Sequence, residues 1–198
     1  MSRERVTACI LAGGRGRRMG GIDKGLMLWH GRPLVEQLVE ALSPQVDRIV
    51  INANRNQETY RRLGHSVIGD ELAGYQGPLA GIAAGLAAAG GGLLAVLPCD
   101  APNLPPDYIE RLCAARRGAP IAVAHDGLRL QPVHALLPVD LLPELREFLA
   151  GGGRKVEAWY ARQGFARADF SDRRETFFNL NQPEDRRLAS LDAAGEHS

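Results

Sequence analysis

Short apolar runs alternate with amphipathic segments along most of the chain. The first run, residues 6–11 (VTACIL), is apolar almost throughout and ends at two glycines, which is typical of a strand buried on both faces. Between Leu34 and Leu42, apolar residues recur at the three- and four-residue spacing of a helix, with Pro33 near its first turn. The pattern therefore predicts a buried strand followed by a helix.

Further strands and helices follow in the same alternation. We expect strands over residues 48–52, 65–68, 93–97, 121–124, 133–137 and 166–170, and helices over 57–63, 79–89, 102–115, 142–149 and 155–162. Strands joined by helices need right-handed crossovers, which produce a mostly parallel sheet. The expected fold class is therefore α/β, with three α/β/α layers, in a single domain over residues 1–190 followed by a disordered tail over 191–198.

Composition and charge narrow the possible functions. The 198 residues include 24 Lys and Arg against 23 Asp and Glu, for a net charge of +1. This balance argues against nucleic-acid or membrane-surface partners, and no apolar stretch has the length of a membrane span or signal sequence. The three cysteines lack metal-ligand spacing, and Cys9 and Cys99 lie in or beside apolar runs. We therefore expect a cytoplasmic protein that attracts anions only locally.

The loop after the first strand carries the first candidate chemistry. Residues 11–26 (LAGGRGRRMGGIDKGL) combine glycines with Arg15, Arg17, Arg18 and Lys24. Glycines allow successive backbone N–H groups to turn toward one centre, and the cations add the positive charge that a polyphosphate requires. The spacing matches neither the dinucleotide motif G-x-G-x-x-G nor the P-loop G-x-x-x-x-G-K-[ST]. A different kind of anion site is favoured, with a flexible, solvated loop as the alternative.

Polar residues also follow three later strands. Asp100 comes just after the most apolar strand, where its carboxylate could hold Mg²⁺ against phosphate oxygens or could cap the following helix. Asn52, Asn54 and Asp70 could bind a base or a ribose, although such residues in loops more often form turns. Ligands bind outside the carboxyl ends of strands in sheets of this kind, so these loops are expected to face one cleft.

Taken together, the motifs resemble one family. The set LAGG-x(3)-RMGG-x-DKGL, INANR, IGD, GPLAGI, LPCDAP, RLQPV, RKV and NLNQPED occurs in this order over residues 7 to about 186, and it resembles the molybdenum cofactor guanylyltransferase family. The resemblance implies a Rossmann-like nucleotidyltransferase fold and transfer of GMP from GTP to molybdenum-molybdopterin, with Mg²⁺ required and pyrophosphate released. It also implies catalytic roles for Arg18 on the leaving phosphates, Lys24 on the α-phosphate and Asp100 on Mg²⁺.

The resemblance assigns further residues to the two substrates. The GTP side would comprise Leu11, Ala12, Gly13, Gly14, Lys24, Asn52, Asp70, Gly77, Pro78 and Leu79. The molybdopterin side would comprise Arg129, Gln131, Arg154, Lys155, Asn179 and Asn181, for which ordinary surface charge and turn chemistry are the alternative. Transient contacts with molybdenum-insertion proteins and molybdoenzyme targets are the expected partners.

Two other functions stay open on the sequence. A relative that uses CTP or another phosphate acceptor would share the glycine loop and the aspartate. A noncatalytic GTP-binding adaptor that delivers the cofactor would need the loop without turnover. The presence of Arg18, Lys24 and Asp100 together argues against the adaptor.

Overall fold

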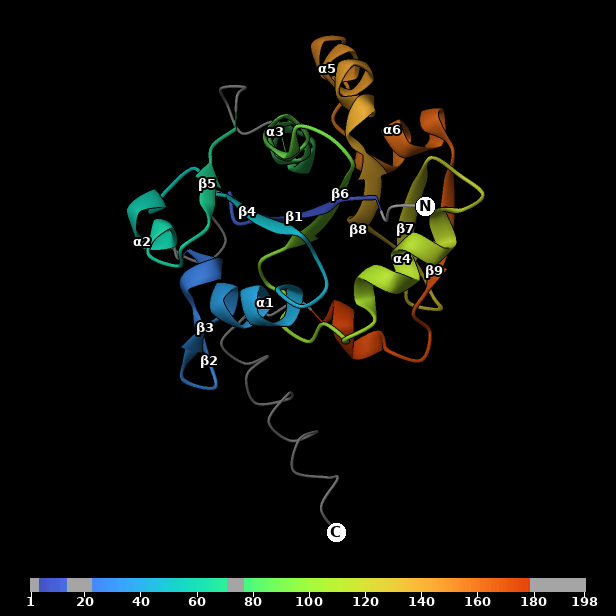
Figure 1. The fold of residues 1–198 in the computed structure, drawn as a ribbon. Helices are drawn as coiled ribbons and strands as arrows, with labels where there is room; N and C mark the ends of the chain where they lie inside the picture. The colour runs from blue at the N-terminus through green and yellow to red at the C-terminus, as the bar shows by residue number, and fades with distance from the viewer. Residues whose placement is uncertain (1–3, 14–22, 71–76, 179–198) are drawn as a thin grey trace.

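A seven-stranded sheet organises the chain (Figure 1). The computed structural model describes residues 4–13, 23–70 and 77–178. The strand order is β5-β4-β1-β6-β8-β7-β9. The strands are β1 (Val6–Leu11), β4 (Arg48–Asn52), β5 (Ser66–Ile68), β6 (Leu93–Pro98), β7 (Ile121–His125), β8 (Leu130–Pro138) and β9 (Phe165–Asp169). The expected tail over 191–198 lies outside the described residues.

The sheet is mostly parallel, as the alternating pattern predicts. The pairs β5-β4, β4-β1, β1-β6 and β7-β9 are parallel. Strand β8 runs antiparallel to both β6 and β7. No helix separates β7 from β8, so the short loop between them returns the chain in the opposite direction, as in a hairpin.

Helices cover both faces of the sheet, which confirms the α/β class. Helix α3 lies over one face and α1 over the other (Figure 1). The helices are α1 (Leu34–Leu42), α2 (Gln57–Arg61), α3 (Pro78–Ala89), α4 (Tyr108–Arg116), α5 (Leu142–Ala150) and α6 (Val156–Gln163). Among the described residues, none of these helices has the length and apolar character needed to cross a membrane.

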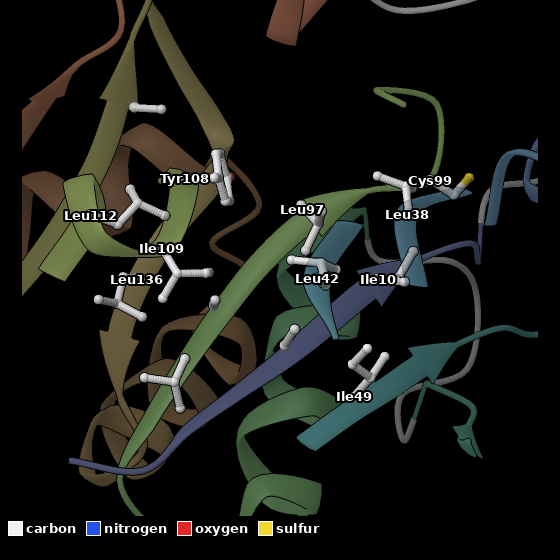
Figure 2. Close-up of a cluster of buried hydrophobic side chains, with 14 of the residues drawn as sticks. Ile10, Leu38, Leu42, Ile49, Leu97, Cys99, Tyr108, Ile109, Leu112 and Leu136 are labelled. Atoms are coloured by element: carbon white, nitrogen blue, oxygen red, sulfur yellow. The ribbon is translucent and has the colours of Figure 1, made fainter. Parts of the chain in front are cut away.

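The apolar side chains form one cluster on each side of the sheet. In one cluster, Leu38 and Leu42 of α1 pack with Ile10 and Leu97 of the sheet (Figure 2). The other cluster joins α3, α5 and α6 to the opposite face. Small residues bring α3 very close to the sheet, since a Cβ on Gly85 would lie 2.9 Å from Cys9 Sγ. The alanine-rich sequence of this helix therefore has a packing reason.

Strand register places four loops at one edge of the sheet. Ile68 lies opposite Asn52, Asn52 opposite Leu11, and Leu11 opposite Pro98. Strands β5, β4, β1 and β6 therefore end in a single row at their carboxyl ends. Every loop that leaves this row starts beside the others, which is where ligands bind in open α/β sheets.

A small hairpin next to the first loop was not expected from the sequence pattern. Strands β2 (Leu28–Trp29) and β3 (Arg32–Pro33) follow the 3₁₀ turn η2 (Lys24–Leu26). His30 and Gly31 form the two-residue connection and both have positive φ, 49° and 78°. Such turns suit the twist of a hairpin. The strands are only two residues long, so they carry no periodicity that a sequence pattern could reveal.

Candidate active site

Lys24 and Asp100 meet at the carboxyl edge of the sheet. The Lys24 ammonium donates a hydrogen bond to Asp100 Oδ2 at 2.8 Å, with side chains 29% and 11% exposed. The loop that carries Asp100 is tied to the end of β1, because Cys99 N donates to Leu11 O at 3.1 Å. Two of the three expected catalytic side chains thus lie in contact beside the first strand.

Asp100 does not cap the helix that follows it. Helix α4 begins at Tyr108 and its N-cap residue is Asp107, seven positions further along the chain. The helix-capping role that the sequence also allowed for Asp100 is therefore excluded. Its side chain instead accepts a hydrogen bond from Lys24.

The neighbouring cysteines are not nucleophiles. Burial raises the pKa of the Cys99 thiol, and the nearby Asp100 and Asp23 carboxylates raise it further. Burial also raises the pKa of Cys9 to about 12, with a smaller contribution from Asp70. Because the thiolate is the reactive form, both residues behave as small apolar side chains, as their apolar surroundings in the sequence predict.

A second cluster joins Asn52, Asn54 and Asp70. Asn52 Nδ2 donates to Asp70 Oδ1 at 3.0 Å, and Asn54 Nδ2 donates to Asp70 Oδ2 at 2.8 Å. Asn54 also accepts from Asp70 N at 2.8 Å and donates to Gly13 O at 3.3 Å. Asn54 therefore connects the first loop to Asp70. The family resemblance did not assign it to GTP, although the INANR motif contains it.

Close packing explains two glycines in this cluster. A Cβ on Gly13 would lie 2.9 Å from Asn54 Nδ2 and 3.1 Å from Asn52 Oδ1. A Cβ on Gly81, in the first half of α3, would lie 2.7 Å from Asn52 Oδ1 and 2.8 Å from Leu11 Cδ2. Ala12 N also donates to Asn52 O at 2.8 Å. The ends of β1 and β4 and the beginning of α3 thus form one tightly packed unit.

The beginning of α3 adds partial positive charge to this edge. Gly77, with a φ of 79°, precedes the helix and Pro78 is its first residue. The free N–H groups and the dipole at a helix N-terminus favour anions. Leu79 is fully buried in the apolar cluster on this face, so its side chain serves packing and only its backbone belongs to the edge.

The hairpin between β7 and β8 places two residues expected on the molybdopterin side. Gln131 is buried and its amide donates to Asp126 Oδ2 at 2.7 Å. Asp126 Oδ1 accepts from Leu128 N at 2.8 Å and Arg129 N at 2.7 Å. Because β7 is joined to β8 there and β8 is antiparallel to β6, this hairpin lies at the carboxyl edge of the sheet. Arg129 is exposed at its tip.

The other residues expected on that side are less closely tied to the edge. Arg154 Nη1 donates to Leu149 O at 2.8 Å and Gly153 O at 2.6 Å, so it caps the end of α5. Lys155 is exposed and precedes α6. Neither of the two Arg154 hydrogen bonds joins it to Lys24 or Asp100. The remaining predicted site residues, Gly14, Arg18, Asn179 and Asn181, lie outside the described part of the chain.

The Asp100 carboxylate suits a magnesium ion that takes its other ligands from a substrate and from water. Within residues 4–13, 23–70 and 77–178, no three His, Cys, Asp or Glu side chains are grouped to hold a metal ion. Mg²⁺ commonly takes one or two protein carboxylates and completes its shell with phosphate oxygens and water. Asp100, with hard oxygen donors and 11% of its side chain exposed, fits that pattern.

An α/β sheet with a lysine and a strand-end carboxylate at its carboxyl edge, and a glycine-rich sequence after its first strand, fits a nucleotidyltransferase, and the comparisons show that this is the class of the protein. Residues 8–165 match the family model described as MobA-like NTP transferase domain. The chain belongs to this family.

Named relatives extend over nearly the whole chain. A molybdenum cofactor guanylyltransferase from Shewanella sediminis is 45% identical over 187 residues, which cover 93% of this chain and 95% of that protein. One from Shewanella woodyi is 46% identical, with 91% and 93% covered. Members of the family that the sequence motifs indicate are thus similar to this chain along its length.

Solved structures agree with the architecture. The chain superimposes on molybdopterin-guanine dinucleotide biosynthesis protein A from Archaeoglobus fulgidus with a TM-score of 0.76 at 25% identity, covering 95% and 98% of the two chains. A 2-C-methyl-D-erythritol 4-phosphate cytidylyltransferase from Thermus thermophilus superimposes with a TM-score of 0.70 at 17% identity, covering 97% and 100%. The second likeness shows the shared fold, and both confirm the expected fold class.

Proposed function

We propose that this protein transfers GMP from GTP to molybdenum-molybdopterin, forming the guanine dinucleotide cofactor and releasing pyrophosphate. The observation that carries the proposal is the 2.8 Å contact between Lys24 Nζ and Asp100 Oδ2, located where the loops after β1 and β6 meet. The names of the relatives supply the acceptor and the nucleotide.

The reaction makes few demands on proton transfer. A phosphate oxygen of the acceptor attacks the α-phosphorus of GTP in line with the departing pyrophosphate. That oxygen is already ionised, so the protein needs no general base. Its task is to bring two polyanions together and to stabilise charge on the transferring phosphoryl group.

Lys24, Arg18 and Asp100 perform that task in our proposal. Lys24 leaves Asp100 for the α-phosphate, and Arg18 binds the leaving phosphates. Asp100 would hold Mg²⁺, which would neutralise phosphate charge as a Lewis acid. The backbone of residues 11–13 holds the nucleotide beside them. Each cationic side chain in such a site supplies on the order of 3 kcal/mol of transition-state stabilisation.

Asp70 is suited to select guanine. Guanine offers an N1–H and an exocyclic amine, so its recognition requires acceptors. The amides of Asn52 and Asn54 each occupy one lone pair of the Asp70 carboxylate and fix its plane. Each carboxylate oxygen has a second lone pair, which leaves acceptor capacity for a base or a ribose. Gly77 and Pro78 lie at the start of α3, next to this cluster, on the same nucleotide side.

In our proposal, molybdopterin binds at the same edge of the sheet as GTP, on the part formed by β7 and β8. Arg129 and Gln131 mark it on the hairpin between β7 and β8. Arg154, Lys155, Asn179 and Asn181 are assigned to it by the family motifs alone. The product is handed to molybdenum-insertion and target proteins in the cytoplasm, because a reactive cofactor is better transferred than released.

Measurement of pyrophosphate release tests the reaction. The protein is incubated with molybdenum-loaded molybdopterin and Mg²⁺, and with GTP or CTP in separate reactions. We expect pyrophosphate and a guanine dinucleotide with GTP. Release with CTP alone would show that the base is wrongly assigned. Tight GTP binding without any release would instead favour the noncatalytic adaptor.

A further inference from the structure

Asp23, which immediately precedes Lys24, is held by two side chains of a different element. Tyr60 Oη donates to Asp23 Oδ1, and Asn56 Nδ2 donates to Asp23 Oδ2 at 2.9 Å. Tyr60 lies in α2, and Asn56 is the N-cap residue of that helix. Both carboxylate oxygens of Asp23 are therefore occupied by α2 and its cap.

The residue on the other side of Lys24 is fixed by the same tyrosine. A Cβ on Gly25 would lie 2.5 Å from the Tyr60 hydroxyl oxygen and 3.3 Å from its ring carbons, so only glycine fits. Leu26 N donates to Asp23 O at 3.2 Å and Met27 N to Lys24 O at 3.1 Å, which closes the 3₁₀ turn. Lys24 is thus the middle residue of a segment whose two neighbours both rest on Tyr60.

Tyr60 is itself firmly placed. Its side chain is fully buried in the apolar cluster on the α1 side of the sheet. Burial, followed by the hydrogen bond to Asp23, raises the pKa of Tyr60, so the group stays a phenol that can donate. Asn56 has a φ of 50°, a left-handed conformation that asparagine adopts more readily than most residues. Residues 23–25 therefore rest on a buried tyrosine and on the N-cap residue of its helix.

We propose that Asp23, Tyr60 and Asn56 form an anchor that fixes the backbone of Lys24, so that its ammonium contacts Asp100 in the free protein and a phosphate of the bound nucleotide. Asp23 and Tyr60 are positioning residues in this proposal, and they act only through Lys24. The proposal rests on the proposed function in one respect, that Lys24 contacts a phosphate of the nucleotide.

The physical reason is the freedom of a lysine side chain. Its four-carbon stem has many rotamers and therefore a large conformational entropy. A backbone that also moves would spread the ammonium over a still larger volume. A displacement of about 1 Å at a group that contacts the reacting phosphate can cost on the order of a hundredfold in rate. Fixing both neighbours of Lys24 removes the backbone part of this freedom.

A double-mutant cycle separates the anchor from a purely structural role. Four proteins are compared: the wild type, Tyr60→Phe, Lys24→Met and the double variant. Pyrophosphate release measures kcat, calorimetric titration with Mg²⁺·GTP measures affinity, and thermal melting measures stability. We expect Tyr60→Phe to lower kcat about tenfold when Lys24 is present and less than twofold when it is absent. The change in melting temperature should be the same in both backgrounds.

Tyr108→Phe is the matched control. Tyr108 is also fully buried in the same apolar cluster, and its hydroxyl bonds to His134 Nδ1 at 3.0 Å rather than to the Lys24 segment. This variant also removes the hydroxyl of a buried tyrosine and the hydrogen bond that it makes. We expect a similar drop in melting temperature with no part of the kinetic effect that depends on Lys24.

An exchange of the two polar partners supplies a rescue. Asp23→Asn keeps an acceptor for Tyr60 but loses the negative charge, so once the Asn56 amide turns over, a weaker neutral hydrogen bond replaces the charged one. Adding Asn56→Asp restores a carboxylate and an amide donor with their sides exchanged. We expect Asp23→Asn to lose about tenfold in kcat and the double exchange to recover most of it.

The outcomes decide the proposal. Equal losses for Tyr60→Phe with and without Lys24, or the same Lys24-dependent loss for Tyr108→Phe, would overturn the anchor. A wild type that binds GTP and releases no pyrophosphate would overturn the proposed function instead. The anchor would then be decided by the GTP affinities of the same four proteins, because an adaptor also uses Lys24 to hold a phosphate.

Discussion

The Lys24 ammonium lies 2.8 Å from Asp100 Oδ2, although 76 residues separate the two along the chain. One residue comes from the 3₁₀ turn after the glycine-rich loop and the other from the loop after β6. In our proposal, this lysine contacts the α-phosphate and this carboxylate holds Mg²⁺ during nucleotidyl transfer. They also neutralise each other there, so the partly buried carboxylate is not left unpaired.

Asp100→Asn is expected to abolish turnover. The amide keeps the shape of the side chain but loses the charge that would bind Mg²⁺ and pair with Lys24. We expect pyrophosphate release to fall by on the order of a hundredfold or more. Circular dichroism and thermal melting should show an intact fold. Near-normal activity with GTP would remove Asp100 from the site.

Asn54→Ala is expected to weaken GTP binding. Asn54 makes two hydrogen bonds to Asp70 and one to Gly13, so its loss would free the carboxylate to rotate. Hydrogen bonds to charged groups contribute about 1.5–3 kcal/mol, and a tenfold or larger loss of GTP affinity by calorimetry would fit that range. Gln57→Ala is the control, because within the described part of the chain the Gln57 side chain hydrogen-bonds to Ala53 O and Arg61 and not to Asp70. Unchanged affinity in Asn54→Ala would show that Asp70 needs no such support.

Gly81→Ala is expected to disturb the nucleotide edge. The added methyl group would lie 2.7 Å from Asn52 Oδ1 and 2.8 Å from Leu11 Cδ2, which pushes α3 away from the ends of β1 and β4. The strain costs about 1–3 kcal/mol, of which the better helix propensity of alanine returns about 1 kcal/mol. We expect a small loss of stability in urea unfolding and a several-fold loss of GTP affinity.

Gly85→Ala separates these two effects. Its methyl group would contact Cys9 and Leu94 in the apolar cluster, away from the edge. Similar destabilisation with unchanged GTP affinity is expected for this variant. Equal affinity losses in Gly81→Ala and Gly85→Ala would mean that α3 acts only through overall stability.

His134 is expected to make stability depend on pH. Burial lowers its pKa from the ordinary 6.5 to about 3, and its ring packs with Tyr108 and Phe177. Between these pKa values the unfolded chain binds a proton that the folded chain does not. The free energy of unfolding should therefore fall by about 1.4 kcal/mol for each unit that the pH drops below 6.5, and level off below 3.

His134→Asn provides the comparison for that dependence. Urea unfolding between about pH 5 and 7.5 should give a shallower slope for the variant, by up to about 1.4 kcal/mol per pH unit. An unchanged slope would assign the dependence to other groups.

Most of the regular elements could be predicted from local patterns. The apolar run of β1 has the bounds that the pattern indicates, and α3 begins one residue earlier than predicted, at Pro78, and ends before Gly90 as predicted. These signals are local, since they depend on periodicity and on residues that break it. The hairpin at residues 28–33 was missed because two-residue strands have no period, and its turn depends on the φ values of His30 and Gly31.

The candidate site was predictable in its chemistry and less so in its contacts. Asn52, Asp70 and Asp100 could be singled out because polar residues follow apolar strands. The hydrogen-bond partners of Gln131 and Arg154 could not be predicted, because the sequence does not show which group a basic or amide side chain outside the predicted elements will contact. Gln131 binds Asp126, and Arg154 binds carbonyl oxygens at the end of α5. The INANR and DKGL motifs contain Asn54 and Asp23. Only the structure shows that Asn54 hydrogen-bonds to Asp70 and that Asp23 accepts from Tyr60.

By itself, the sequence determined the kind of sheet, the glycine-rich first loop and the supply of charged groups at the strand ends. These properties follow from hydrophobic periodicity, backbone freedom and residue chemistry, which act between near neighbours. Only the tertiary structure decided that Lys24 meets Asp100 and that Asp23 rests on Tyr60, across 76 and 37 residues. Those contacts depend on which strands and helices become neighbours, as β1 and β6 do, and elements so far apart in the sequence meet only when the whole chain packs.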